Sequence, residues 1–126
     1  MSDHADTFGQ TTRRAVLGAD HVARAAAAKT AFDAPFQQMI TDLAWGRLWS
    51  DETIPRRERS MLTLAILAAT GSEEEIAMHV RATARTGASR SDVAQAFRHV
   101  TVYAGVSRAN RAFTIAKAAS AEMGGE

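Results

Sequence analysis

The chain has 126 residues, of which 46% are hydrophobic, and a formal net charge of +1, so a single globular domain is expected rather than a disordered protein. Acidic and basic residues are mixed along the chain, without the concentrated basic face of a protein dedicated to nucleic acid or anionic membranes. The absence of cysteine excludes disulfides, thiol catalysis and cysteine-ligated metals.

The absence of several known motifs excludes further classes of function. The four histidines are scattered without HxxxH or HExxH spacing, so no metal site is expected. No phosphate-binding loop, GxGxxG motif or Gly-x-Ser-x-Gly elbow occurs, which leaves nucleotide and serine-hydrolase chemistry without a basis. The N-terminal residues lack an apolar signal region and no apolar run could span a membrane. We therefore expect a soluble cytoplasmic protein.

Apolar periodicity predicts an all-α, compact single domain (residues 1–126) of about six helices, because strand patterns and hairpin turns are missing. Residues 1–11 are expected to be a flexible N-terminus. Met61–Ala69 is apolar almost all round and is predicted to be the most buried helix. The expected helices run from about Thr12 to Lys29, from Asp33 and Pro35 to the tryptophans, over Met61–Ala69, from Ser72 to Gly87, from Ser89 or Ser91 to Gly105, and from Ser107 to about Ala119.

The segment Ser72–Gly87 contains the most informative pair of side chains. Glu75 and His79 are four residues apart, so on a helix both leave from one face, one turn apart. A carboxylate beside an imidazole can fix its tautomer and raise its basicity, which suits proton transfer near pH 7. Alternatively, Ser72 and Glu75 form a capping box, in which Glu75 binds the N-cap amide and has no catalytic role.

The sequence WGRLW places Trp45 and Trp49 one helical turn apart. Large rings fill volume and Gly46 permits a close helix crossing, so a packing corner is the simpler interpretation. The alternative is an aromatic wall for a small planar ligand.

Three arginines precede the apolar helix. Arg56 and Arg57 fit a solvated face, whereas Arg59 leads directly into the helix and is the best candidate to point inward at a carboxylate. Near the end of the chain, Tyr103 and Asn110 flank a helix–turn–helix joint. They could donate hydrogen bonds into a cavity or satisfy the backbone of the joint.

Five segments carry a resemblance to a known family that runs from about Arg13 to Ala119. They closely resemble the 4-carboxymuconolactone decarboxylases, whose wider superfamily includes alkylhydroperoxidase-type proteins that use a CxxC pair. The lack of cysteine excludes that peroxidase chemistry here. The resemblance implies an alkylhydroperoxidase-like helical fold that assembles into rings, as a trimer or hexamer, without a cofactor. The segments are RRAVLGADHVARA, PFQQMITDLAWGRLW, RRERSMLTLAILAATG, EEEIAMHVRATARTG and YAGVSRANRAF.

The activity that this resemblance implies is decarboxylation of 4-carboxymuconolactone to 4-oxoadipate enol-lactone in protocatechuate catabolism. His79 would donate the proton, oriented by Glu75, and Arg59 would hold a substrate carboxylate. Tyr103 and Asn110 would be secondary donors. Trp45 and Trp49 would line the ring of the substrate.

The sequence departs from the family pattern at three places. Many members have Gly-Glu at Gly46-Arg47, Arg-Pro-Gly-Leu at Asp51–Ile54, and a proline-alanine-alanine-asparagine turn at Ser107–Asn110. The first two departures could change the substrate, so a paralogue acting on another lactone or acid, or a silent member, is an alternative. A helical DNA-binding or regulatory module is a third possibility, disfavoured by the near-neutral charge.

Overall fold

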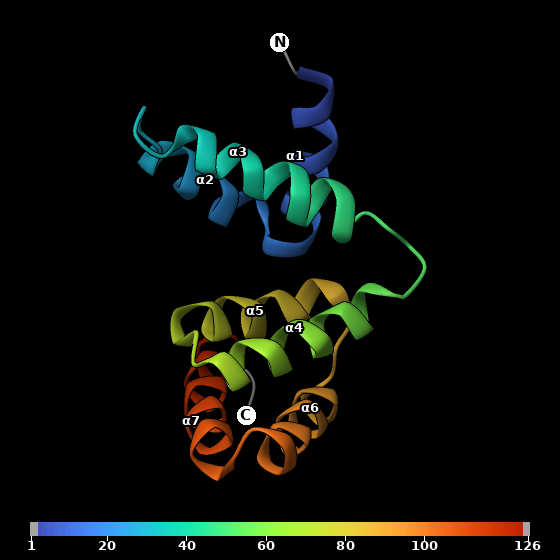
Figure 1. Cartoon of the computed structure of the whole chain (residues 1–126), viewed down its shortest axis with the longest axis vertical. Coiled ribbons are helices and arrows are strands. Elements are labelled where there is room, and N and C mark those ends of the chain that lie inside the picture. The colour runs from blue at the N-terminus through green and yellow to red at the C-terminus, as the bar shows by residue number, and fades with distance from the viewer. Residues whose placement is uncertain (1–2, 125–126) are drawn as a thin grey trace. The chain divides into compact units, whose positions relative to one another are not determined.

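The computed structural model describes residues 3–124 and the side chains of residues 8–124. All regular structure in that range is helical, which confirms the predicted all-α class (Figure 1). None of these helices is long and apolar enough to cross a membrane. The chain, which the sequence analysis treated as one domain, divides into two compact units, Met1–Ile54 and Pro55–Glu126. The helical elements are α1 Asp3–Leu17, α2 Ala19–Ala28, α3 Ala34–Ile40, the π-helix η1 Thr41–Leu48, α4 Arg56–Thr70, α5 Glu73–Thr86, α6 Arg90–Tyr103 and α7 Val106–Glu122.

The first unit begins with two helices where the sequence predicted one. Gly18 separates α1 from α2 with a φ of 95°, a conformation that residues with a Cβ rarely adopt, so the prediction of one helix over 12–29 is wrong. Helix α1 already begins at Asp3, within the segment that we expected to be flexible. Met1 and Ser2 lie outside the described residues.

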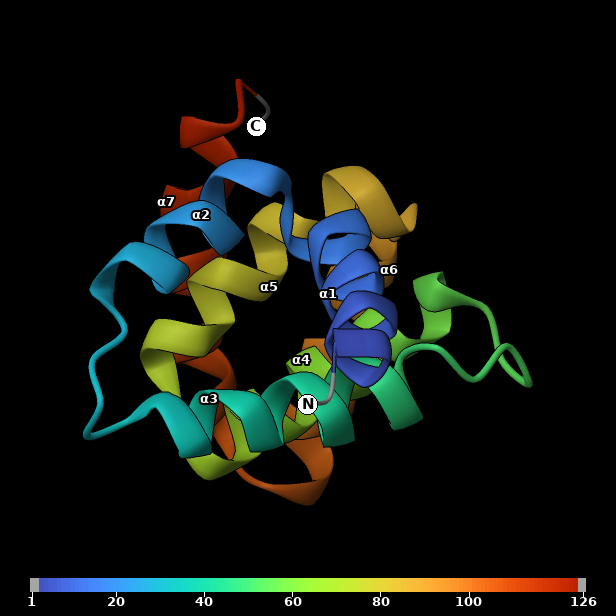
Figure 2. The ribbon, with the colours of Figure 1, turned by 90° about the horizontal axis from the view of Figure 1, so that it is seen from above.

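The rest of the first unit carries the tryptophans. The connection between α2 and α3, light blue in Figure 2, leads to α3, which starts after Asp33 as predicted. From Thr41 the helix continues as η1 with π-type hydrogen bonds. A Cβ added at Gly9 of α1 would lie 2.5 Å from the Thr41 carbonyl oxygen, and one at Gly46 would lie 3.8 Å from the Gly9 Cα. The predicted close helix crossing at Gly46 is therefore confirmed, with Gly9 as its counterpart.

The second unit packs α4, α5, α6 and α7 around one apolar core. The alanines that α7 contributes to this core are buried, and Phe113 is half-buried with its ring edge-on to Phe97 at a centroid distance of 5.3 Å. The core consists of Leu64, Ala68, Ile76, Val80, Val93, Phe97, Val100, Ala109, Ala112, Ala116 and Ala119.

Helix α4 differs from its prediction. It begins at Arg56 rather than near Met61, and it is not the most buried helix, because Leu62 is 55% exposed and Ile66 is 61% exposed. Only one face of its apolar run joins the core of this unit. A helix that is apolar on all sides is expected to be buried. The sequence does not show, however, which of its sides pack against another helix of the same chain.

Several helix ends in the second unit follow the sequence, and the start of the last helix does not. Gly71 and Gly87 end α4 and α5 in left-handed conformations, as predicted. Ser89, and not Ser91, caps α6 through a capping box with Asp92. The expected cap of the last helix, Ser107, is wrong, since α7 begins after Gly105, whose φ is 114°.

Candidate functional site

Helix α5 presents His79 as a buried polar side chain, only 6% exposed. The core side of this helix is formed by Ile76 and Val80. His79 lies on a neighbouring stripe with Ala82 and Thr86, three and seven residues further on, and these residues are buried without belonging to the apolar core cluster. The histidine is therefore buried on α5 outside the apolar core cluster of its own unit.

Glu75 is exposed, one turn before His79 on α5. Within the described part of the chain it makes no hydrogen bond or ion pair, so it does not bind His79 directly. The alternative capping box is wrong as well, because Ser72 makes no side-chain bond to the helix. The Ser72 hydroxyl instead shares a hydrogen bond of 2.9 Å with that of Thr70. Glu75 is thus an exposed carboxylate one helical turn before His79, and it does not cap the helix.

The three arginines before the core of α4 have different environments. Arg56 is half-buried and Arg57 is exposed. Arg57 forms an ion pair with Asp92 of α6 at 2.7 Å. The hydrogen bonds from Arg57, followed by the bond from the Ser89 amide, hold the pKa of Asp92 well below its ordinary value, and the same pair raises the pKa of Arg57. Arg59 is only 9% exposed, which confirms that it is the arginine of this cluster that points inward.

A buried hydrogen bond sets how α4 and α5 lie side by side. The hydroxyl oxygens of Ser60 and Thr86 are 2.6 Å apart, so the start of α4 is level with the end of α5. Arg59 immediately precedes Ser60, and Thr86 follows His79 by two helical turns, about 10 Å along the axis. The structure therefore places a buried cation and a buried imidazole on adjacent helices, about 10 Å apart along the hairpin.

The tryptophans lie in the first unit and are both 4% exposed. Their ring centroids are 5.3 Å apart with an interplanar angle of 35°. The Ser50 hydroxyl donates to the Trp45 carbonyl oxygen at 2.6 Å, and it is also hydrogen-bonded to Thr12 at 2.6 Å. These contacts show a packed corner that joins η1 to α1, so the packing role is confirmed. Contact with a ligand remains a prediction.

Tyr103 and Asn110 differ from the expectation that they face a cavity with His79. Tyr103 is 82% exposed and stacks on His99 at a centroid distance of 5.8 Å. Asn110 is also exposed. Neither side chain is hydrogen-bonded to another side chain in the part of the chain that the structure describes. The single chain does not bring them together with the buried histidine, because both lie at the solvent-facing joint between α6 and α7.

Sequence reasoning missed the buried Ser60–Thr86 pair. The only signal was the position of Ser60 directly after Arg59, and a serine at a helix start is ordinarily interpreted as a cap. The pair matters because it fixes the register of the two helices that carry Arg59 and His79.

Comparison of the sequence with known proteins identifies its family. The sequence profile of the carboxymuconolactone decarboxylase family matches residues 34–118. A 4-carboxymuconolactone decarboxylase from Acinetobacter baylyi is 35% identical over 116 residues, which cover 92% of this chain and 87% of that protein. A nitrosuccinic acid decarboxylase from Metarhizium robertsii is 33% identical over 97 residues, covering 77% of this chain and 68% of that protein.

Both relatives are decarboxylases by name, which supports a carboxy-lyase role. The family match spans most of the chain, and the helical fold is the alkylhydroperoxidase-like one that the resemblance implied. The chain belongs to the carboxymuconolactone decarboxylase family.

Proposed function

We propose that the protein removes CO2 from 4-carboxymuconolactone and releases 4-oxoadipate enol-lactone, in the protocatechuate branch of aromatic catabolism. The observation that carries the proposal is the pairing of buried Arg59 and buried His79 on adjacent helices of a chain that covers most of a 4-carboxymuconolactone decarboxylase. A cation and a proton donor are what a lactone dicarboxylate requires for this reaction.

The substrate supplies its own electron sink. When the bond between the ring carbon and its carboxylate breaks, the electron pair moves through the ring double bond onto the lactone carbonyl oxygen. The resulting dienolate takes a proton at the α-carbon, and CO2 leaves. The protein then has to bind the substrate, stabilise the negative oxygen and deliver one proton.

Arg59 is proposed to hold the carboxylate of the acetate arm. The planar guanidinium matches a carboxylate with two parallel hydrogen bonds. The other carboxylate loses its charge as it leaves, so a tight cation there would stabilise the ground state more than the transition state. Clamping the arm that does not react avoids this penalty.

His79 is proposed to deliver the proton to the α-carbon. His79 lies on the helix next to the one that carries Arg59, about 10 Å from the level of Arg59 along the hairpin. Glu75, one turn away on the same helix, is proposed to assist His79 through its negative charge. Trp45 and Trp49 are proposed to line the ring. Because Tyr103 and Asn110 are exposed on this chain, they are left out of this mechanism.

A second candidate keeps the reaction and changes the substrate. The similarity to a nitrosuccinic acid decarboxylase is close to that with the lactone enzyme, at 33% against 35% identity. The departures at Arg47 and Asp51–Ile54 also favour a different acid. The test is CO2 release from 4-carboxymuconolactone and from nitrosuccinate, each at matched concentration. Faster release from the lactone supports the first proposal, and faster release from nitrosuccinate replaces it with the second.

We also propose that the active protein is a homo-oligomer. Large apolar side chains stay exposed on both units, more than a monomer usually leaves in contact with water. Light scattering should give a mass that is a multiple of 13.5 kDa, and a stable species of 13.5 kDa at micromolar concentration contradicts this. These exposed residues are Phe8, Phe32, Phe36, Met39, Leu43, Leu48, Leu62, Ile66, Val102, Tyr103 and Val106.

A further inference from the structure

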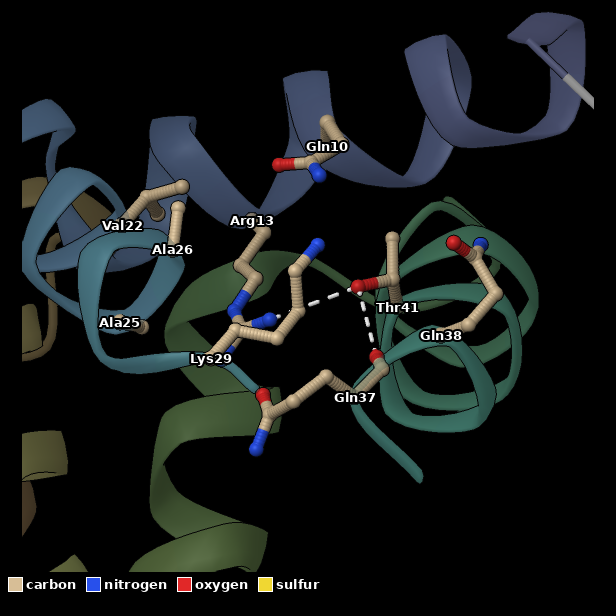
Figure 3. A pocket seen from close by; sticks show the side chains of 9 residues that line it. All are labelled: Gln10, Arg13, Val22, Ala25, Ala26, Lys29, Gln37, Gln38 and Thr41. Carbon is tan, nitrogen blue, oxygen red and sulfur yellow. Dashed lines mark hydrogen bonds between the residues drawn. The ribbon is translucent and has the colours of Figure 1, made fainter. Parts of the chain in front are cut away.

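The first unit contains a hollow between α1, α2 and the α3–η1 helix (Figure 3). The hollow is partly open, and its empty space of about 340 Å³ includes some of the surrounding solvent. The residues that line it come from the first unit alone, so it does not depend on the candidate decarboxylase site. They are Gln10, Arg13, Val22, Ala25, Ala26, Lys29, Gln37, Gln38 and Thr41.

The charge of this hollow is not balanced. Arg13 and Lys29 both line it, and none of the described residues that line it is Asp or Glu. Neither cation makes an ion pair within the part of the chain that the structure describes. Two acids that lie close in sequence to lining residues are engaged elsewhere, Asp33 four residues after Lys29 and Asp42 directly after Thr41. Asp33 accepts hydrogen bonds from Thr30, and Asp42 accepts one from Gln38.

Arg13 also has unused hydrogen-bonding capacity. Its Nη1 donates to the Thr41 hydroxyl at 3.4 Å, a long contact. Its Nε is buried and has no partner among the described residues. Burial lowers the pKa of Arg13 from its ordinary value, which shows that the charge has lost part of its hydration. A buried donor on a cation without an acceptor is unfavourable, and an anion would supply the acceptor.

We propose that this hollow binds a small oxyanion, of the carboxylate or phosphate class, between Arg13 and Lys29. The free Nε of Arg13 would donate to one oxygen, and the Lys29 ammonium would provide the second positive charge. Figure 3 shows the amide groups of Gln10 and Gln37 on opposite sides of Arg13, where they can donate further hydrogen bonds.

Thermal unfolding and calorimetric titration of the full chain test this inference. Sodium phosphate and sodium acetate are the two probes, and sodium chloride at equal ionic strength is the reference. One oxyanion or both should raise the melting temperature in a saturable way, and the more effective probe identifies the class. No increase beyond that with chloride would overturn the proposal, because screening alone would then explain the response.

Two matched pairs of variants locate the binding. Arg13→Gln should weaken the effective oxyanion by about tenfold or more, the scale of one charged hydrogen bond. Arg14→Gln makes the same charge change at an exposed neighbour that does not line the hollow and should bind as the unmodified chain does. Equal weakening in both variants would show a general charge effect and overturn the site.

The second pair decides the matter if Arg13→Gln fails to fold, as judged by circular dichroism. Lys29 is exposed enough to be replaced safely, so Lys29→Gln should fold and bind the oxyanion severalfold more weakly. Lys117→Gln removes an equally exposed lysine of the second unit and should have no effect. Unchanged binding in Lys29→Gln would contradict the proposal.

Discussion

Arg57 and Asp92 form a two-pronged ion pair in which Nε and Nη2 of the arginine each donate to a different carboxylate oxygen at 2.7 Å. The same carboxylate accepts the backbone N–H of Ser89 at 2.8 Å and so closes the capping box of α6. One side chain therefore ties the first turn of α4 to the first turn of α6. Arg59 lies in that turn of α4, two residues after Arg57.

The ion pair predicts how stability depends on acid. The pKa of Asp92 in the folded chain lies below its ordinary value of 3.8, so its stabilising contribution is present above that value and is lost as the pH falls through the folded pKa. Asp92→Asn should be less stable than the unmodified chain in urea at pH 7, and the difference should shrink below about pH 4. Glu52→Gln, at an exposed acid, should show no such convergence. A difference that stays constant from pH 7 to pH 3 would contradict the assignment.

The capping box at α6 predicts different effects for two serines. Ser89 accepts the Asp92 backbone N–H through its side chain, whereas Ser72 at α5 makes no such bond. Ser89→Ala should therefore lower the free energy of unfolding by about 1 kcal/mol, the usual loss for a removed cap. Ser72→Ala is the matched control and should lower the free energy of unfolding by only about a few tenths of a kcal/mol. Chemical denaturation measures both, and a larger loss at Ser72 would show that the cap was assigned to the wrong helix.

Local signals in the sequence predicted the helix ends well where a single residue decides the geometry. Gly71 and Gly87 were predicted because a left-handed residue after a helix is most often glycine. Gly18 carries the same signal but stands within an apolar pattern that continues on both sides, so the break was missed. The π-helical segment has no sequence signal, because the apolar spacing of Trp45 and Trp49 fits an α-helix equally well.

The site was predictable to a similar degree. Arg59 could be separated from Arg57 by its place next to the apolar run, and the structure agrees. Exposure was harder to predict, because it depends on how distant helices pack. Tyr103 was predicted either to donate a hydrogen bond into a cavity or to satisfy the backbone of its joint, and its side chain is exposed. Arg13, the centre of the proposed anion site, has no distinguishing signal in the sequence. Only the three-dimensional structure shows that none of the described residues lining the hollow beside it is acidic.

The proposed clamp predicts a selective loss of substrate binding. Arg59→Lys keeps the positive charge but loses the planar fork that matches a carboxylate. We expect KM for the lactone to rise about tenfold or more, as for a lost charged hydrogen bond, with the melting temperature little changed. Arg56→Lys is the matched control on the same turn and should leave KM unchanged. If Arg59→Lys has unchanged KM and kcat, Arg59 is not the clamp.

Glu75 tests whether a nearby charge alone assists His79. The structure excludes a capping box at this position, so Glu75→Gln should not lower the melting temperature. If the carboxylate supports the protonated imidazole, kcat should fall by about 10²-fold, the lower end of what acid–base partners contribute. Glu74→Gln removes an equally exposed neighbouring charge and should have full activity. A fully active Glu75→Gln enzyme would remove Glu75 from the mechanism.

The central claim is that this chain decarboxylates 4-carboxymuconolactone with His79 as the proton donor. It is tested most directly by the rate of CO2 release from that lactone by the unmodified chain and by His79→Asn, with circular dichroism and melting temperature recorded for both. The account predicts release by the unmodified chain and a loss of about 10²-fold or more in the variant, which should remain folded. No release by the unmodified chain, or equal release by a folded His79→Asn variant, would contradict it.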